Sequence, residues 1–129
     1  MPRQRTWVAV CQEYVSGPIE TRAKARKLAA DWNEFGGCHL DHYIVAKDEF
    51  DYLRQADRQL LSNTISACKA HHHAWINVFD LQGEFSAITT DTRTLARDWC
   101  MRGVFRTDFV IEMGVLQAAL ASQDRKDLR

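Results

Sequence analysis

RKLAADWNEFGGCHLDHYI, at residues 26–44, returns in altered form as RTLARDWCMRGVFRTDFVI at residues 93–111. Eight of the nineteen aligned positions are identical, at a constant separation of sixty-seven residues. The identical pairs are Arg26 with Arg93, Leu28 with Leu95, Ala29 with Ala96, Asp31 with Asp98, Trp32 with Trp99, Gly36 with Gly103, Asp41 with Asp108 and Ile44 with Ile111. Self-similarity at a fixed separation is typical of a duplicated structural unit. The sequence therefore predicts one module that occurs twice, at about residues 6–70 and 74–123.

Local patterns predict the elements of each half. Alternating apolar residues indicate strands, and apolar residues spaced three and four apart indicate helices. The expected strands are 6–14, 40–46, 75–79, 84–88 and 107–113, and the expected helices are 21–35, 48–73, 91–102 and 115–122. We therefore expect a single domain over residues 1–129, an α+β two-layer sandwich with a ferredoxin-like pseudo-twofold axis. Its four- to five-stranded sheet should carry helices mainly on one face, and helix-joined neighbouring strands should run parallel.

The repeated residues are expected to be structural. Leu28, Ala29 and Trp32, together with their counterparts, should pack each helix onto the sheet. The glycines should end the helices, and Asp41 and Asp108 should cap turns before the returning strands, although paired carboxylates can also form a metal or acid–base site. His42 is the main difference, because Phe109 takes its place in the second copy. It is either a hydrogen-bonded core histidine or a catalytic or ligand-binding residue.

Bulk composition limits the classes of function. The formal net charge is zero, so attraction to nucleic acid or to an anionic membrane would need a local patch. No apolar run approaches the roughly 18 residues of a membrane span, and no apolar stretch follows the N-terminus as in a secretory signal. The four cysteines lack CxxC spacing and are expected to be reduced thiols. We expect a cytoplasmic protein without membrane contact.

A basic run opens the first predicted helix, at Arg22, Lys24, Arg26 and Lys27. Cations at this end of a helix oppose its dipole, and a bound phosphate would satisfy both the side chains and the free amides. The run is therefore a candidate anion or nucleic-acid site, and a solvated helix face is the alternative. The sequence shows no accompanying platform of aromatic residues for base stacking.

Histidines and cysteines gather in two places, Cys68 with His71–His73 and Cys38-His39 with His42. Thiolate and imidazole are ligands that zinc and related metals prefer. The spacing lacks a double CxxC or an HxxxH anchor, so a polar helix end is the competing interpretation.

Some of these residues resemble the HNH endonuclease family. Asp41-His42 resembles the family's Asp-His pair, Asn63 follows at a workable distance, and His72 lies nine residues beyond. The resemblance implies that His42 is a general base, with Asn63 as a second catalytic residue. It also implies that Asp41 and His72 hold a divalent metal ion. Cys68, from its spacing to His71, is a further candidate ligand. The sequence departs from the family where a glycine-containing hairpin would stand, because residues 48–61 are predicted to be helical.

The chain shows none of the GxGxxG, GxxxxGK[ST], GxSxG or HExxH motifs. We therefore expect a small non-catalytic binding protein, an adaptor, regulator or inhibitor that needs no cofactor. Its partner is expected to be another protein or, through the basic run, nucleic acid. A sheet edge near Glu84–Ile88 could also pair two copies of the chain. The alternative is a metal-dependent hydrolase or nuclease that uses Asp41, His42 and His72.

Overall fold

The computed structural model describes residues 5–35, 41–100, 105 and 107–124. Within these ranges the chain is α+β, as expected, with five strands and five helices. The strands are β1 (Trp7–Val10), β2 (Tyr43–Ala46), β3 (Trp75–Leu81), β4 (Glu84–Thr90) and β5 (Asp108–Glu112). The helices are α1 (Arg22–Phe35), α2 (Lys47–Gln55), α3 (Arg58–His71), α4 (Arg93–Asp98) and α5 (Met113–Asp124). Among the described helices, none is both long and apolar enough to cross a bilayer.

The strands form two separate sheets. β1 pairs with β2, and the other three strands have the order β4-β3-β5. All of these pairings are antiparallel. The prediction of one continuous sheet was therefore wrong, and so was the prediction that helix-joined neighbours run parallel, because β1 and β2 are antiparallel. The reason is that the chain forms a hairpin before each helix, so the helix connects the second hairpin strand, and not the central strand, to the returning strand. These two connected strands lie on either side of the central strand and are parallel to each other.

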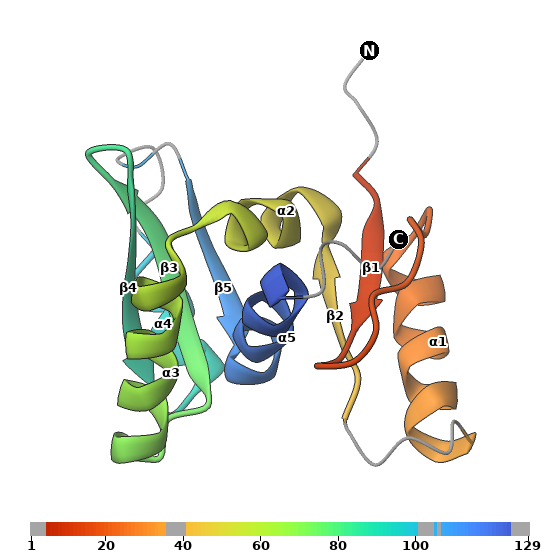
Figure 1. Ribbon diagram of the computed structural model, residues 1–129. Helices are drawn as coiled ribbons and strands as arrows, with labels where there is room; N and C mark the ends of the chain where they lie inside the picture. The colour runs from red at the N-terminus through yellow and green to blue at the C-terminus, as the bar shows by residue number, and fades with distance from the viewer. Residues whose placement is uncertain (1–4, 36–40, 101–104, 106, 125–129) are drawn as a thin grey trace.

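Helices cover both faces of each sheet, rather than mainly one face as predicted. α1 packs on β1 and β2, and α4 packs on the three-stranded sheet. α2 and α5 lie between the two sheets and contact each other, while α3 packs on α5 and β4 (Figure 1). The two sheets are thus joined through a shared central layer of helices.

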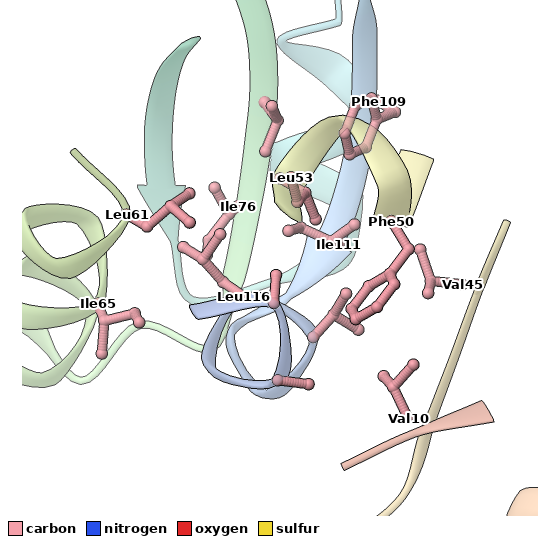
Figure 2. Close-up of a cluster of buried hydrophobic side chains, with 14 of the residues drawn as sticks. Val10, Val45, Phe50, Leu53, Leu61, Ile65, Ile76, Phe109, Ile111 and Leu116 are labelled. Atoms are coloured by element: carbon pink, nitrogen blue, oxygen red, sulfur yellow. The ribbon is translucent and has the colours of Figure 1, made fainter. Parts of the chain in front are cut away.

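The hydrophobic core fills this central layer. Phe50 and Leu53 of α2 meet Leu116 of α5, and the two sheets add residues such as Val45 and Ile111 (Figure 2). Each of these side chains is at most 4% exposed. Burying one of them contributes about 1.5–3 kcal/mol, so the central layer supplies much of the stability.

The two halves place their elements alike. Each central strand, β1 or β3, pairs with a hairpin partner on one side and with the strand that follows the helix on the other. β2 runs directly into α2 after Ala46, and β5 runs directly into α5 after Glu112. The cross-strand pairs Trp7–Ala46 and Trp75–Glu112 both lie at this junction of strand and helix, although at the separation of sixty-seven residues Trp75–Glu112 aligns with Val8–Val45.

The helix predicted over residues 48–73 is two helices. The Asp57 carboxylate accepts hydrogen bonds from the backbone N–H groups of Gln59 (2.8 Å) and Leu60 (3.1 Å), which starts a new helix. α3 ends at His72, whose φ of 55° is left-handed. An aspartate N-cap thus separates α2 from α3 without a glycine or proline.

The helix caps and the repeated apolar residues were predicted in part. Thr21 caps α1 by accepting a hydrogen bond from the Lys24 N–H (3.1 Å), and Thr92 caps α4 by accepting one from the Leu95 N–H (3.2 Å), so the two helices begin close to the predicted positions. Ala29 and Ala96 are buried as expected. Leu95 and Trp99, however, are 42% and 41% exposed, so the second tryptophan does not anchor its helix. α4 ends after six residues, whereas the prediction extended it to residue 102. Gly36 and Gly103 lie outside the described residues.

Candidate functional site

A cleft with a volume of about 290 Å³ opens between the two sheets, alongside β2 and β5. Its walls include Ile44 and Val45 from β2 and residues 110–112 from β5. Two tryptophans, three arginines and two glutamates also line it: Trp7, Trp75, Arg5, Arg22, Arg93, Glu49 and Glu112. Aromatic, cationic and acidic side chains from both halves of the chain therefore meet in one concavity.

Each half contributes one tryptophan and one arginine in the same way. Trp7 is the first residue of β1 and Trp75 is the first residue of β3. Arg22 is the first residue of α1 and Arg93 is the first residue of α4. The cleft is thus lined by the strand and helix starts of both halves, although Arg93 aligns with Arg26 and not with Arg22 in the sequence repeat.

The tryptophans belong to different ends of the cleft. Trp7 lies beside Ala46 at the end of β2, and Trp75 lies beside Glu112 at the end of β5. β2 and β5 run in opposite directions (Figure 1), so their ends point to opposite ends of the cleft.

Two arginines lie close to Trp7. The guanidinium carbons of Arg5 and Arg22 are 5.9 and 5.8 Å from the centre of the Trp7 ring. Both distances allow a cation–π attraction, which is worth about 0.5–1 kcal/mol at exposed sites. The Trp7 end of the cleft therefore concentrates positive charge.

The arginines differ in their acidic partners. Arg5 pairs with Asp48 (3.5 Å) and more distantly with Glu49 (3.8 Å). Arg22 and Arg93 form no ion pair with any residue in the described part of the chain. Two exposed guanidinium groups at the cleft thus keep their donors available for an anion.

The two glutamates that line the cleft, Glu49 and Glu112, both have raised pKa values. Burial, reinforced by the Asp48 carboxylate and opposed by Arg5, raises the pKa of Glu49 from 4.5 to about 7. Burial also raises the pKa of Glu112, with Arg93 opposing the shift and Asp41 adding to it. Carboxyl groups with displaced pKa values in a concavity are typical of functional sites, although structural networks produce them as well.

The predicted basic run is only partly in this cleft. Arg22 lines the cleft, whereas Lys24 extends toward Glu20 and pairs with it at 3.3 Å. Lys24, Arg26 and Lys27 are exposed and do not line the cleft. Helical spacing turns Lys24 and Lys27 well away from Arg22, because each residue advances about 100° around the axis. Of the four residues only Arg22 lines the cleft, while Arg26 lies one turn further along the same face of α1.

His42 is buried and hydrogen-bonded. Its Nδ1 lies 3.0 Å from Asn33 Oδ1, and its backbone N–H donates to the same oxygen at 2.7 Å. Its ring also meets the Trp32 ring edge-on, with a centroid distance of 5.2 Å. The expectation of a buried position is confirmed, but the ring packs toward α1, whereas Phe109 belongs to the central core.

The other residues of the HNH-like and metal hypotheses are dispersed. Asp41 is exposed beside β2, whereas α3 lies beyond α5 on the far side of the molecule (Figure 1). On α3, Asn63 is exposed and accepts a bond from Gln59 Nε2 (2.8 Å), and Cys68 is buried with a pKa raised by burial. His72, just past α3, is exposed. Over the described ranges, no three His, Cys, Asp or Glu side chains are placed to hold a metal ion. Cys38 and His39 lie outside those ranges.

Sequence reasoning placed Trp7 and Trp75 in strands but did not connect them with the arginines. The available signal was that each tryptophan opens a strand and that an arginine opens the helix that follows. The distances along the chain, fifteen and eighteen residues, hide the contact until the strands are paired. Glu49 and Glu112 could not be identified as site residues from the sequence, because single acidic residues are common on helices and strands.

Comparison with known proteins gives no further assignment: no protein family, curated protein or solved structure matches the chain.

Proposed function

We propose that this protein is a small non-catalytic binding protein whose inter-sheet cleft binds the phosphate groups of nucleic acid. The observation that carries the proposal is that Arg22 and Arg93, neither of which forms a salt bridge within the described residues, line one cleft that also contains two tryptophans. Such a protein would act as a regulator or inhibitor by binding nucleic acid and blocking access to it, without catalysing a reaction.

Arginine suits phosphate because its planar guanidinium donates two parallel hydrogen bonds to an oxyanion. Tryptophan next to arginine suits nucleic acid in particular, since every base offers a flat face for stacking. A simple carboxylate ligand would use the arginines and leave the exposed parts of both tryptophan rings without a partner. The combination of side chains therefore favours a ligand that carries both phosphate and aromatic rings.

The overall neutrality of the chain is compatible with this proposal. Arg22 and Arg93, which form no salt bridge within the described residues, attract phosphate at short range, and the other charges of the chain matter less because charges beyond about 10 Å are screened at ordinary salt concentrations. The two cleft glutamates limit the total positive charge, and this favours a ligand with few phosphates in contact. We therefore expect modest affinity and a shallow dependence on salt compared with strongly basic proteins.

The test is binding of a fluorescent single-stranded oligonucleotide to a double variant, Arg22→Gln with Arg93→Gln. We expect the Kd to rise at least about tenfold, which corresponds to about 1.4 kcal/mol. Lys24→Gln with Lys27→Gln is the matched control, because it removes the same charge from exposed residues outside the cleft. Equal losses in both double variants, or no binding by the wild-type protein, would refute the proposal.

A protein partner is the second candidate, and the exposed edge of the three-stranded sheet favours a second copy of this chain. β4 is an edge strand of seven residues that pairs with β3 without a bulge and carries Ile88, 42% exposed. After Glu84 at its start, the strand has no charged residue and no proline, and regular edges of this kind tend to add strands. Sedimentation of the wild-type protein and of an Ile88→Lys variant tests this, since a dimer that the lysine abolishes is the expected result.

We also propose that the two halves arose by duplication of one hairpin–helix–strand–helix unit, with α3 as the connection. The support is the matched layout of the elements and the position of the pairs Trp7–Ala46 and Trp75–Glu112 at the junction of strand and helix. If the chain is a duplication, positions where the halves differ are the best guide to an acquired function.

A further inference from the structure

We infer that the Trp75 end of the cleft holds one unpaired nucleobase that carries an exocyclic amino group, with Glu112 accepting a hydrogen bond from that group. The inference rests on the proposed function and specifies the ligand further: single-stranded nucleic acid, with cytosine, adenine or guanine preferred to thymine or uracil at this position.

The first support is the geometry of the pair. Trp75 and Glu112 are directly opposite each other in the antiparallel pairing of β3 with β5. Directly opposed residues project from the same face of a sheet, with Cβ atoms about 4.5–5.5 Å apart. Both side chains are partly exposed and both line the cleft. A base stacked on the indole would therefore present its polar edge to the carboxylate.

The second support is the unused bonding capacity of Glu112. Its carboxylate forms no hydrogen bond or ion pair with the described residues, although it is half-buried. Neither carboxylate oxygen of Glu112 is a fully buried atom without a partner, so solvent reaches the group and a ligand donor can take the place of that water. The donors with the right geometry are the amino groups of cytosine, adenine and guanine. Thymine and uracil have no exocyclic amino group, and their single N3–H donor lies between two carbonyl oxygens that a carboxylate repels.

The groups around Glu112 are consistent with a carboxylate that accepts a bond. Arg93 lies close enough to lower its pKa and Asp41 close enough to raise it. The Tyr43 hydroxyl is also nearby, since Asp41 and Glu112 both raise the pKa of that group in addition to its burial. Arg93 can thus serve two purposes, because it favours the ionised form of Glu112 and offers donors to the phosphate of the same nucleotide.

The third support is the contrast between the two ends of the cleft. Beside Trp7, at the junction of strand and helix, the first half has Ala46, which is fully buried and has no polar side-chain atom. The Trp7 ring is also flanked by Arg5 and Arg22, whereas no cation–π contact to Trp75 is found within the described residues. One end is therefore suited to phosphate and the other to a base.

The size of the cleft favours a single strand over a duplex. A volume of about 290 Å³ lies at the lower limit of small-molecule pockets, which suits one nucleotide rather than a duplex surface. In a duplex, the faces of the bases are covered by their neighbours and their amino groups are paired. Stacking on Trp75 therefore requires an unpaired base.

The experiment measures the Kd of the intact protein for oligo(dC), oligo(dA) and oligo(dT) of equal length and for a duplex. We expect oligo(dC) and oligo(dA) to bind at least about fivefold more tightly than oligo(dT), since one good base contact is worth about 1–3 kcal/mol. The duplex should bind more weakly than any of the single strands. Glu112→Gln should reduce the ratio between oligo(dC) and oligo(dT) toward one, because an amide can also donate to a carbonyl oxygen.

Trp75→Ala tests the stacking and should weaken binding of oligo(dC) about fivefold or more. Trp75→Phe is the companion variant, which keeps an aromatic ring and should retain most of the affinity if the alanine variant folds poorly. Equal affinity for oligo(dC) and oligo(dT), an unchanged ratio in Glu112→Gln, or a duplex that binds as tightly as a single strand would overturn the inference. Those outcomes leave phosphate binding by Arg22 and Arg93 intact, whereas absence of binding to every oligonucleotide overturns both proposals.

Discussion

The ring of Tyr43 in β2 packs against Gly114 in the first turn of α5, so closely that a Cβ at residue 114 would overlap the ring carbons. This contact joins a strand of the two-stranded sheet to a helix of the second half. It is one of the places where the central helices fix the position of one sheet relative to the other, and thereby the shape of the cleft between them.

Gly114→Ala is expected to destabilise the fold, because the added methyl group forces Tyr43 or the start of α5 to move. Overpacking of this kind costs about 1–3 kcal/mol. The free energy of unfolding from urea denaturation measures the effect. Gly17→Ala is the control, since a Cβ at that position would meet no atom within 4 Å. Equal stability of the two variants would contradict the close contact.

Asn33→Ala is expected to destabilise the fold through His42. The variant removes the acceptor of the His42 backbone N–H and the partner of its ring nitrogen in a buried position. Leaving buried donors without partners costs about 1–3 kcal/mol. Asn63→Ala, an exposed change on α3, should cost much less. If both variants lose the same stability in chemical denaturation, the bonds between Asn33 and His42 are not structural.

The raised pKa of Glu49 predicts that the free energy of unfolding falls as the pH rises. Its pKa is about 7 in the folded protein and 4.5 in the unfolded chain, so the folded state holds the proton more tightly. The stabilisation is complete below about pH 4.5 and is lost as the pH rises through about 7. The loss is about 3 kcal/mol at most, since each unit of pKa difference corresponds to about 1.4 kcal/mol.

The measurement compares Glu49→Gln with the wild-type protein by denaturation at several pH values. The variant should gain stability relative to the wild-type protein as the pH rises from 4.5 to about 7. Glu20→Gln, an exposed change in a surface ion pair, should show no such trend. If the Glu49→Gln variant were instead the less stable protein at high pH, the ion pair with Arg5 would outweigh the burial of the carboxylate.

The two repeated tryptophans are expected to differ in their importance for stability. Trp32 packs edge-on against Tyr14 (4.9 Å between ring centroids) and against His42, while Trp99 is 41% exposed. Trp32→Ala should therefore lower the free energy of unfolding more than Trp99→Ala, the latter by about 1 kcal/mol or less. Thermal or urea unfolding of both variants measures the two losses. Equal losses of unfolding free energy would contradict the larger structural role of Trp32.

The sequence predicted the local elements more successfully than their assembly. The pattern at residues 93–111 and its earlier copy correctly indicated a helix followed by a strand, since periodicity is a local property. The split into two sheets depends on the packing of α2 against α5, which no local pattern encodes. The break at Asp57 could have been predicted from the sequence, because aspartate is a common N-cap. Its carboxylate accepts hydrogen bonds from backbone N–H groups two and three residues later, which have no partner within the helix.

The candidate site was predictable only in part for the same reason. Arg22 was identified from its charge, but its neighbours in the sequence, Lys24 and Lys27, are not its neighbours in the cleft. Trp75 and Arg93 reach the same cleft only because β3 pairs with β5 and α4 packs on the sheet they form. Residues that meet through sheet pairing carry no shared spacing along the chain, so sequence reasoning could not group them.

The most direct measurement of the central claim is the salt dependence of oligonucleotide binding by the wild-type protein and by the Arg22→Gln/Arg93→Gln variant. Each phosphate contact to a single strand contributes a slope of about 0.7 in a plot of log K against log salt concentration. If the two arginines bind phosphates, the slope of the variant should be smaller by about 1.4. An unchanged slope, with or without a change in affinity, would contradict phosphate binding at the cleft.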